Sequence, residues 1–144
     1  MTGWLFDTSV LSAFAPGRPT LSTNVSLWVE NRSNELFLST VAVMEVGAGV
    51  AKLRRAGAAR RAGVLEAWLG NVLDLYGERI LPFDLAAAHI AGELHDVAMS
   101  IGRHPGFADI AIAAIAKSRG LVVLTVNYRH FEPLGIETFN PLER

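Results

Sequence analysis

The 144-residue sequence predicts a single α/β domain, residues 1–144, with a central and mostly parallel sheet. Short apolar runs of the kind that form buried strands alternate along the chain with longer segments whose apolar residues recur at helical spacing. The strands expected at 3–7 and 35–39 also end alike, at hydroxyl or acidic residues that can start the next helix. Strands that alternate with helices imply crossover connections, which place helices on both faces of the sheet.

Composition excludes several kinds of site and location. The chain has no cysteine, so disulfides and thiolate metal sites are impossible, and metal ligands must be oxygen atoms or histidine nitrogens. No membrane-spanning or signal segment is evident, so we expect a cytoplasmic protein without membrane contact. The net charge of −1 argues against a surface that is basic throughout but allows a local basic patch. Because 51% of the residues are hydrophobic, we also expect a homodimer or a partner surface.

The first half of the chain predicts two strands and four helices. A short helix over 8–15 ends at the breaker Pro16-Gly17, and a helix over 20–32 carries an apolar stripe that places Trp28 in the core. The strand over 35–39 leads into a helix over 40–56 that begins with a hydroxyl cap. A helix over 58–76 follows, with a stripe predicted to be buried that comprises Val64, Leu65, Trp68, Leu69, Val72 and Leu75.

The second half predicts a brief strand over 80–83, placed at the sheet edge because Pro82 lacks an amide hydrogen. Asp84 caps a helix that reaches about residue 101, and a loop over 102–106 follows. The helix over 107–119 is stopped by Gly120. A β-branched strand over 121–124 and a last short strand over 137–139 complete the expected elements.

Three acidic residues stand among apolar neighbours, where an unpaired carboxylate is costly. They are Asp7 at the end of the first strand, Glu45 in the second turn of a helix, and Asp109 at the start of a nearly apolar one. Each could be satisfied separately by arginine or backbone amides, and Asp7 alone would be a helix cap. If they converge at the strand ends, they form an all-oxygen site for Mg²⁺ or Mn²⁺. Asn127, just beyond the strand over 121–124, would be a fourth oxygen donor.

Such a site suggests a metal-dependent nuclease or phosphatase. A hard cation can polarise a phosphodiester and lower the pKa of a bound water that then attacks phosphorus. A receiver-like signalling module also places acids around Mg²⁺ at strand ends, but it needs a lysine where this chain has Thr125-Val126-Asn127. The sequence therefore favours hydrolysis over phosphoryl signalling.

Four motifs in order carry a resemblance over essentially the whole chain. Residues 5–11 (LFDTSVL), 39–46 (STVAVMEV), 108–116 (ADIAIAAIA) and 124–127 (LTVN) resemble a PIN domain of the VapC toxin family, of the FitB-like branch. The resemblance implies a three-layer α/β/α fold and a Mg²⁺-dependent endoribonuclease toxin of a type II toxin–antitoxin system, held inactive by a cognate VapB-like antitoxin. It implies that Asp7, Glu45 and Asp109 are the catalytic and metal-binding acids, and that Asn127 occupies a variable fourth catalytic position.

Two features leave alternatives open. Many relatives have aspartate where this chain has Asn127, so the number of metal ions is open, and so is a catalytically impaired PIN fold that only binds RNA or antitoxin. A basic cluster without intervening acid, made of Lys52, Arg54, Arg55, Arg60 and Arg61, could contact RNA phosphates or form a solvated corner between helices. His104 and His130 are expected in loops near the site, each incidental or in contact with substrate.

Overall fold

Five parallel strands form one sheet in the order β3-β2-β1-β4-β5. The computed structural model describes residues 2–143. Its strands are β1 (Trp4–Phe6), β2 (Leu36–Ser39), β3 (Ile80–Leu81), β4 (Val122–Leu124) and β5 (Thr138–Phe139). Its α-helices are α1 (Thr8–Ala13), α2 (Thr23–Glu30), α3 (Thr40–Arg55), α4 (Ala59–Tyr76), α5 (Leu85–Ser100), α6 (Phe107–Arg119) and α7 (Tyr128–Phe131).

The strand order reverses at β1, which is the central strand. From β1 the chain adds β2 and β3 on one side and then returns to add β4 and β5 on the other. Parallel register pairs Leu5 with Phe37 of β2 and with Val123 of β4. In open α/β sheets, the crevice beyond the carboxyl ends of the strands at such a reversal is the usual ligand site. The topology therefore directs attention to the residues that follow β1 and β4.

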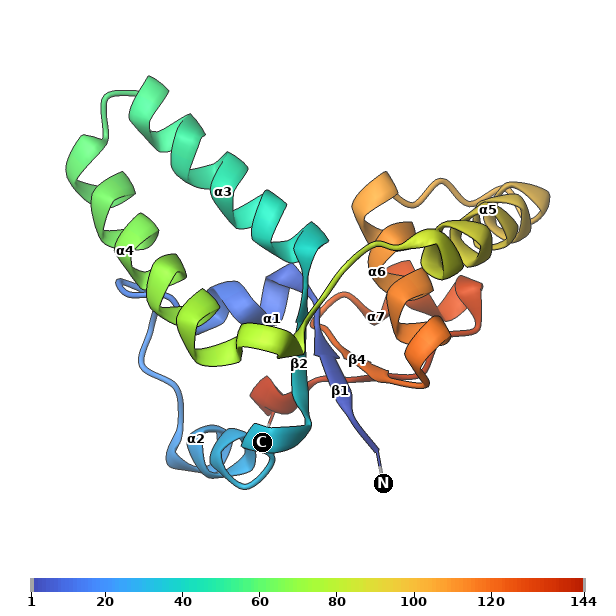
Figure 1. Ribbon diagram of the computed structural model, residues 1–144, viewed down its shortest axis with the longest axis horizontal. Helices are drawn as coiled ribbons and strands as arrows, with labels where there is room; N and C mark the ends of the chain where they lie inside the picture. Colours follow the sequence, from blue (N-terminus) through green and yellow to red (C-terminus); the bar gives the residue numbers. More distant parts are fainter. Residues whose placement is uncertain (1, 144) are drawn as a thin grey trace.

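Helices cover both faces of the sheet, which confirms the predicted three-layer α/β/α class (Figure 1). Because successive strand residues point to opposite faces, Leu5 packs with α5, α6 and α7, whereas Trp4 and Phe6 pack with α1, α2 and α4. Both faces are thus apolar, as expected for parallel strands. Trp28 is buried on the second face, as predicted, and stacks on Phe139 at a centroid distance of 5.3 Å.

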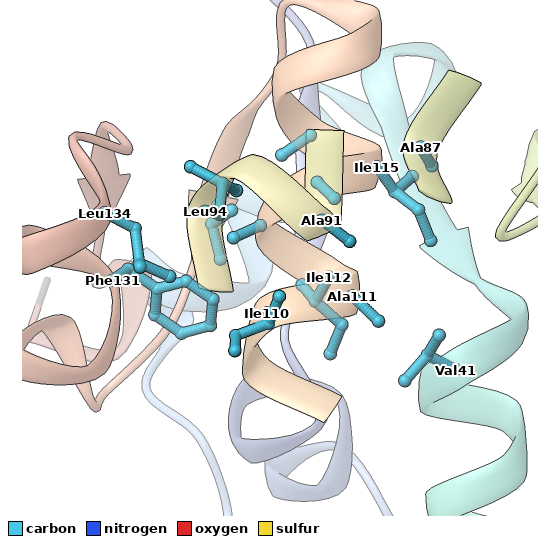
Figure 2. Close-up of a cluster of buried hydrophobic side chains, with 14 of the residues drawn as sticks. Val41, Ala87, Ala91, Leu94, Ile110, Ala111, Ile112, Ile115, Phe131 and Leu134 are labelled. Atoms are coloured by element: carbon cyan, nitrogen blue, oxygen red, sulfur yellow. The ribbon is translucent and has the colours of Figure 1, made fainter. Parts of the chain in front are cut away.

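Helix α6 is the most deeply buried helix of the first face. Residues 110–116 are all buried, and Figure 2 shows the α6 side chains enclosed between α5, α7 and Val41. Four alanines in this run let neighbouring helices approach closely, while Ile112 and Ile115 fill the remaining space. Gly120 ends the helix in a left-handed conformation with φ of 66°, as its position predicted. This burial fixes the N-terminal turn of α6, which carries Asp109.

Side-chain caps set several helix boundaries. Ser39 accepts a hydrogen bond from the amide of Ala42 at 3.0 Å, so the hydroxyl cap predicted for α3 comes from the last strand residue. Asp84 caps α5 as predicted, accepting from Ala87 at 3.0 Å. The helix predicted over 20–32 is shorter, because Ser22 caps it and it starts only at Thr23. The prediction of loop structure around His130 is wrong, because that residue lies in α7.

Helices α3 and α4 form an antiparallel hairpin that projects from the body of the domain (Figure 1). The apolar stripe predicted for α4 is only partly buried. Leu69 is buried, Leu65, Trp68 and Val72 are half-buried, and Val64 and Leu75 are 44% and 73% exposed. The prediction of a fully buried stripe is therefore wrong, since α3 and the sheet cover only one edge of it. None of the helices within residues 2–143 is both long and apolar enough to cross a membrane.

Because α6 is enclosed on one side and exposed on the other, substitutions on its two sides should differ greatly in their effect on the free energy of unfolding. Ile112→Ala leaves a cavity in a core that cannot collapse fully, so we expect a loss of about 2–5 kcal/mol in the free energy of unfolding. Lys117→Ala on the exposed side of the same helix should change it by less than about 0.5 kcal/mol. Urea unfolding followed by circular dichroism measures both. Equal losses would contradict the burial of α6.

Candidate active site

The site is built where β1 and β4 end side by side. The backbone amide of Asp7 donates to the carbonyl of Leu124 at 2.8 Å, which ties the residue after β1 to the last residue of β4. Asp7 and Thr125 therefore occupy equivalent places at the carboxyl edge of the sheet, and both side chains are buried. This is the reversal point of the strand order, where open α/β sheets usually bind their ligands.

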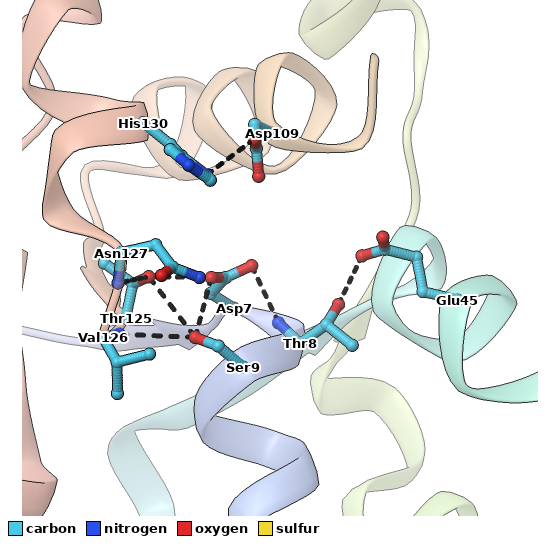
Figure 3. Close-up of polar contacts among 9 residues, drawn as sticks. All are labelled: Asp7, Thr8, Ser9, Glu45, Asp109, Thr125, Val126, Asn127 and His130. Carbon is cyan, nitrogen blue, oxygen red and sulfur yellow. Dashed lines mark hydrogen bonds and ion pairs between the residues drawn. The ribbon is translucent and has the colours of Figure 1, made fainter. Parts of the chain in front are cut away.

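The Asp7 carboxylate is held by three donors, although it is only 5% exposed. Oδ1 accepts the amide of Thr8 at 2.8 Å, and Oδ2 accepts the hydroxyls of Ser9 at 2.9 Å and Thr125 at 2.7 Å (Figure 3). These bonds offset the cost of burying a charge and fix the rotamer. Asp7 is also the N-cap of α1, so the cap and the site residue are the same side chain and not alternatives.

Thr125 and Ser9 are the residues that sequence reasoning missed. Thr125 is 1% exposed; its hydroxyl donates to Asp7 and accepts the backbone amide of Asn127 at 2.9 Å. Ser9 accepts the amide of Val126 at 3.3 Å while donating to Asp7. Together they join the start of α1 to the segment after β4. The one sequence feature that could have identified Thr125 is its position after a buried strand, which matches that of Asp7.

Glu45 lies in the second turn of α3 and is half-buried. Its Oε1 accepts the hydroxyl of Thr8, the residue next to Asp7. Glu45 also lines a hollow of about 240 Å³ between α1, α3 and α4, together with Arg18 and Trp68. The side chain is thus connected to the Asp7 network through a single hydroxyl group.

Asp109 lies in the first turn of α6 and faces the site from the opposite layer (Figure 3). Its Oδ2 is 3.1 Å from Nδ1 of His130. Burial raises the pKa of Asp109; the charge of His130 opposes the shift, and the carboxylates of Asp7 and Glu45 add to it. The three acids therefore interact electrostatically across one crevice. Their pairing with His130 and Thr8 was not foreseen from the sequence.

Asn127 follows Thr125 and precedes α7, with its side chain at an exposed position. Its position is fixed by its backbone amide, which donates a hydrogen bond to the hydroxyl of Thr125. It makes no side-chain cap to α7. The structure thus puts Asn127 next to the Asp7 network, and its role as an oxygen donor stays a prediction.

The donor chemistry of the crevice fits a hard divalent cation. Carboxylate and hydroxyl oxygens gather there, and within residues 2–143 neither Asp7 nor Glu45 has an arginine or lysine nitrogen within 4.0 Å. In the part of the chain that is described, however, no three acidic or imidazole side chains are already placed to hold one ion together. The three acids do not form a preformed ligand set, so ion binding would require the side chains of Glu45 and Asp109 to turn toward the Asp7 carboxylate, which its three donors hold in place.

The basic cluster predicted over 52–61 lies at the corner where α3 turns into α4. Arg54 pairs with Glu66, and Arg61 lies against the turn at Gly17. Lys52, Arg55 and Arg60 are exposed to solvent. The expected corner between two helices is confirmed, while contact with RNA stays open.

Comparison with known proteins gives consistent matches over nearly the full chain. The PIN domain family model matches residues 4–134. The toxin FitB of Neisseria gonorrhoeae is 34% identical over 139 residues, covering 95% of this chain and 96% of that protein. The VapC ribonuclease Y4jK of Sinorhizobium fredii is 33% identical, covering 96% and 97%. The crystal structure of FitAcB from Neisseria gonorrhoeae superposes with a TM-score of 0.81 at 34% identity, covering 96% and 97%.

The raised pKa of Asp109 predicts how stability depends on pH without divalent ions. Because the pKa of Asp109 is raised in the folded protein, the folded state binds this proton more tightly than the unfolded chain does. Raising the pH through the folded-state pKa removes the proton and therefore lowers the free energy of unfolding. We expect Asp109→Asn to have a higher Tm than the unsubstituted protein at pH 7 in EDTA, and the difference should shrink near pH 4. Added Mg²⁺ should raise the Tm of the unsubstituted protein and not that of Asp109→Asn. A lower Tm of the variant in EDTA would show that the His130 pair dominates.

The hydroxyl of Thr125 is predicted to position Asp7. Thr125→Val keeps the shape but removes the donor to Oδ2 and the acceptor for Asn127, whereas Thr125→Ser keeps both. We expect Thr125→Val to weaken binding of Mn²⁺, measured by calorimetry, by about 10- to 100-fold, and Thr125→Ser to restore most of it. Equal affinities of the two variants would contradict a positioning role.

Proposed function

The chain belongs to the PIN-domain family, and from this we propose that it is the toxin of a type II toxin–antitoxin system, a metal-dependent endoribonuclease. Relatives named as a toxin and as a VapC ribonuclease support this over nearly the whole chain. The observation that carries the proposal is the gathering of Asp7, Glu45 and Asp109 beyond the carboxyl ends of β1 and β4, close enough for the first two carboxylates to raise the pKa of Asp109. The family match does not favour the receiver-like alternative.

We assign the divalent ion, Mg²⁺ with Mn²⁺ as a substitute, to the carboxylates of Asp7, Glu45 and Asp109, with Asn127 as a further catalytic oxygen donor. The cation would neutralise these carboxylates, polarise the phosphodiester and lower the pKa of the attacking water. By the resemblance, the 3′ oxygen would be the leaving group, so the product would carry a 5′-phosphate.

Neighbouring residues of the chain hold the side chains of the site in place. Three donors hold the Asp7 carboxylate in one orientation at the carboxyl end of β1. Thr8 holds Glu45 toward the same place, and the hydrogen bond to Asp109 places a proton at Nδ1 of His130. A carboxylate that is fixed before the substrate arrives requires no reorganisation during the reaction.

The projecting hairpin supports an antitoxin partner. Val64 and Leu75 on α4 and Met44 on α3 are exposed apolar side chains. The hollow between α1, α3 and α4 is lined by half-buried apolar side chains and also by Glu45. A partner segment that covers the exposed apolar residues and enters this hollow would lie against a site carboxylate, so the same contact would bind and inhibit.

A second apolar surface supports the proposed homodimer. Leu85 of α5 is 75% exposed, and Phe107 at the start of α6 is 66% exposed. Phe107 packs edge-on against Phe83 at a centroid distance of 5.8 Å, which makes a small aromatic surface next to the first turn of α3, where the amide of Phe83 donates to the hydroxyl of Thr40 at 3.2 Å. Burying this surface against a second copy would remove it from water.

The decisive test is cleavage of RNA by the purified protein. We expect cleavage with Mg²⁺ or Mn²⁺, none in EDTA, and a loss of about 100-fold or more in Asp7→Asn, Glu45→Gln and Asp109→Asn. Glu93→Gln and Asp96→Asn, which remove exposed carboxylates of α5, are the matched controls and should cleave normally. Unchanged cleavage by Asp7→Asn would overturn the site. Mg²⁺ binding without any cleavage by the unsubstituted protein would instead indicate the impaired, binding-only PIN fold.

A further inference from the structure

A basic hollow of about 250 Å³ adjoins the site on the side of Asp109 and lies between the loop over 101–106 and α7. Its lining includes Arg103, His104, Asp109, Arg129, His130 and Pro133. Two guanidinium and two imidazole groups therefore face a space that contains a single carboxylate, and His130 is already paired with that carboxylate. A space of this charge favours an anionic ligand.

The two arginines are free to bind such a ligand. Within residues 2–143, neither Arg103 nor Arg129 has a carboxylate oxygen within 4.0 Å, in contrast to Arg54 and Arg119, which pair with acids. Both side chains are exposed. Guanidinium groups bind phosphate oxygens in a planar, bidentate geometry, so unpaired arginines beside a phosphodiesterase site are suited to the substrate backbone.

The hollow continues away from the site into a second one of about 400 Å³. The two share Arg103, Arg129 and Pro133, and the second extends to Tyr128 and to Glu132, a carboxylate that forms no ion pair with Arg129 within 4.0 Å. The Tyr128 ring is 51% exposed and lies 5.8 Å from the Arg129 guanidinium carbon, and Arg129 donates to its hydroxyl at 3.4 Å. An exposed aromatic ring beside unpaired arginines is the combination that binds single-stranded nucleic acid by stacking and phosphate contact.

The alternative basic cluster at the α3–α4 corner lacks these features. Arg54 and Arg61 of that cluster are engaged within the chain. The corner also lies roughly 15 Å along α3 from Glu45, by the rise of about 1.5 Å per helical residue. The hollow lined by Arg60 and Arg61 contains no aromatic residue. Arg61 also reaches the hollow beside Glu45, which is assigned above to the partner segment.

We propose that the continuous surface formed by Arg103, Tyr128 and Arg129, here called the Arg103–Arg129 groove, binds single-stranded RNA next to the cleavage site. Arg103 and Arg129 contact phosphates adjacent to the one that reacts, and Tyr128 stacks on a neighbouring base. This inference rests on the proposed function for the identity of its ligand. It adds a substrate-binding surface whose contribution is affinity and strand placement and not the chemical step.

The test measures binding separately from cleavage. The parent is Asp7→Asn, and fluorescence anisotropy follows a labelled single-stranded RNA of about 12 nucleotides, a typical site size, over a range of salt concentrations. Adding Arg103→Ala and Arg129→Ala should weaken affinity at least tenfold and reduce the salt slope by about 1.4, since each phosphate contact contributes about 0.7. Tyr128→Ala should weaken affinity about tenfold, and Tyr128→Phe should retain it because the ring remains.

The matched control is the double substitution Arg55→Ala and Arg60→Ala, which removes the same charge from the α3–α4 corner. It should leave affinity and salt slope near those of the parent. An unchanged salt slope in the Arg103/Arg129 variant, or a loss that appears only in the corner variant, would overturn the groove. Absence of RNA binding by the parent would overturn it as well.

The outcomes separate this inference from the proposed function. If the unsubstituted protein fails to cleave RNA while the groove substitutions still abolish binding, the groove stands and the endoribonuclease proposal fails. If the unsubstituted protein cleaves and the groove variants, made in that background, cleave at unchanged kcat and KM, the site stands and the groove is wrong. A raised KM with a kcat near that of the unsubstituted protein supports both.

Discussion

The burial of one carboxylate constrains much of this molecule. Asp7 lies almost out of solvent at the end of the central strand, and a charge in that position needs donors from its surroundings. They come from the first turn of α1 and from the residue after β4, so the β1–β4 pairing, the start of α1 and the site depend on one another. The deep packing of α6 adds Asp109 to this arrangement from the other layer.

Much of the fold follows from local features that can be recognised directly in the sequence. Runs such as 122–124 are apolar on both faces, Asp84 and Gly120 mark the ends of helices, and Pro82 marks an edge strand. The apolar stripe of α4 was wrongly predicted to be fully buried. Helical spacing shows which residues share a face of the helix, but not whether another part of the chain covers that face. Helix α7 was missed because four residues are too few to display a period.

The candidate site was less accessible to prediction than the fold. The acids stand out because carboxylates among apolar neighbours are unusual, and so Asp7, Glu45 and Asp109 could be selected. Their partners are ordinary residue types: a threonine after a strand and a histidine after a turn acquire meaning only when the chain brings Thr125 to Asp7 and His130 to Asp109. The arginines of the groove likewise become one surface only because the loop over 101–106 lies beside α7.

The pairing of β1 with β4 also determines at what stage of synthesis the site can form. β1 is the first strand to be made, yet the hydroxyl that holds its carboxylate is 118 residues further along the chain. A chain that ends before Val122 lacks both this donor and β4, the second partner of the central strand, and one that ends before residue 109 lacks an acid as well. The complete set of contacts around Asp7 can therefore form only after most of the domain has been synthesised.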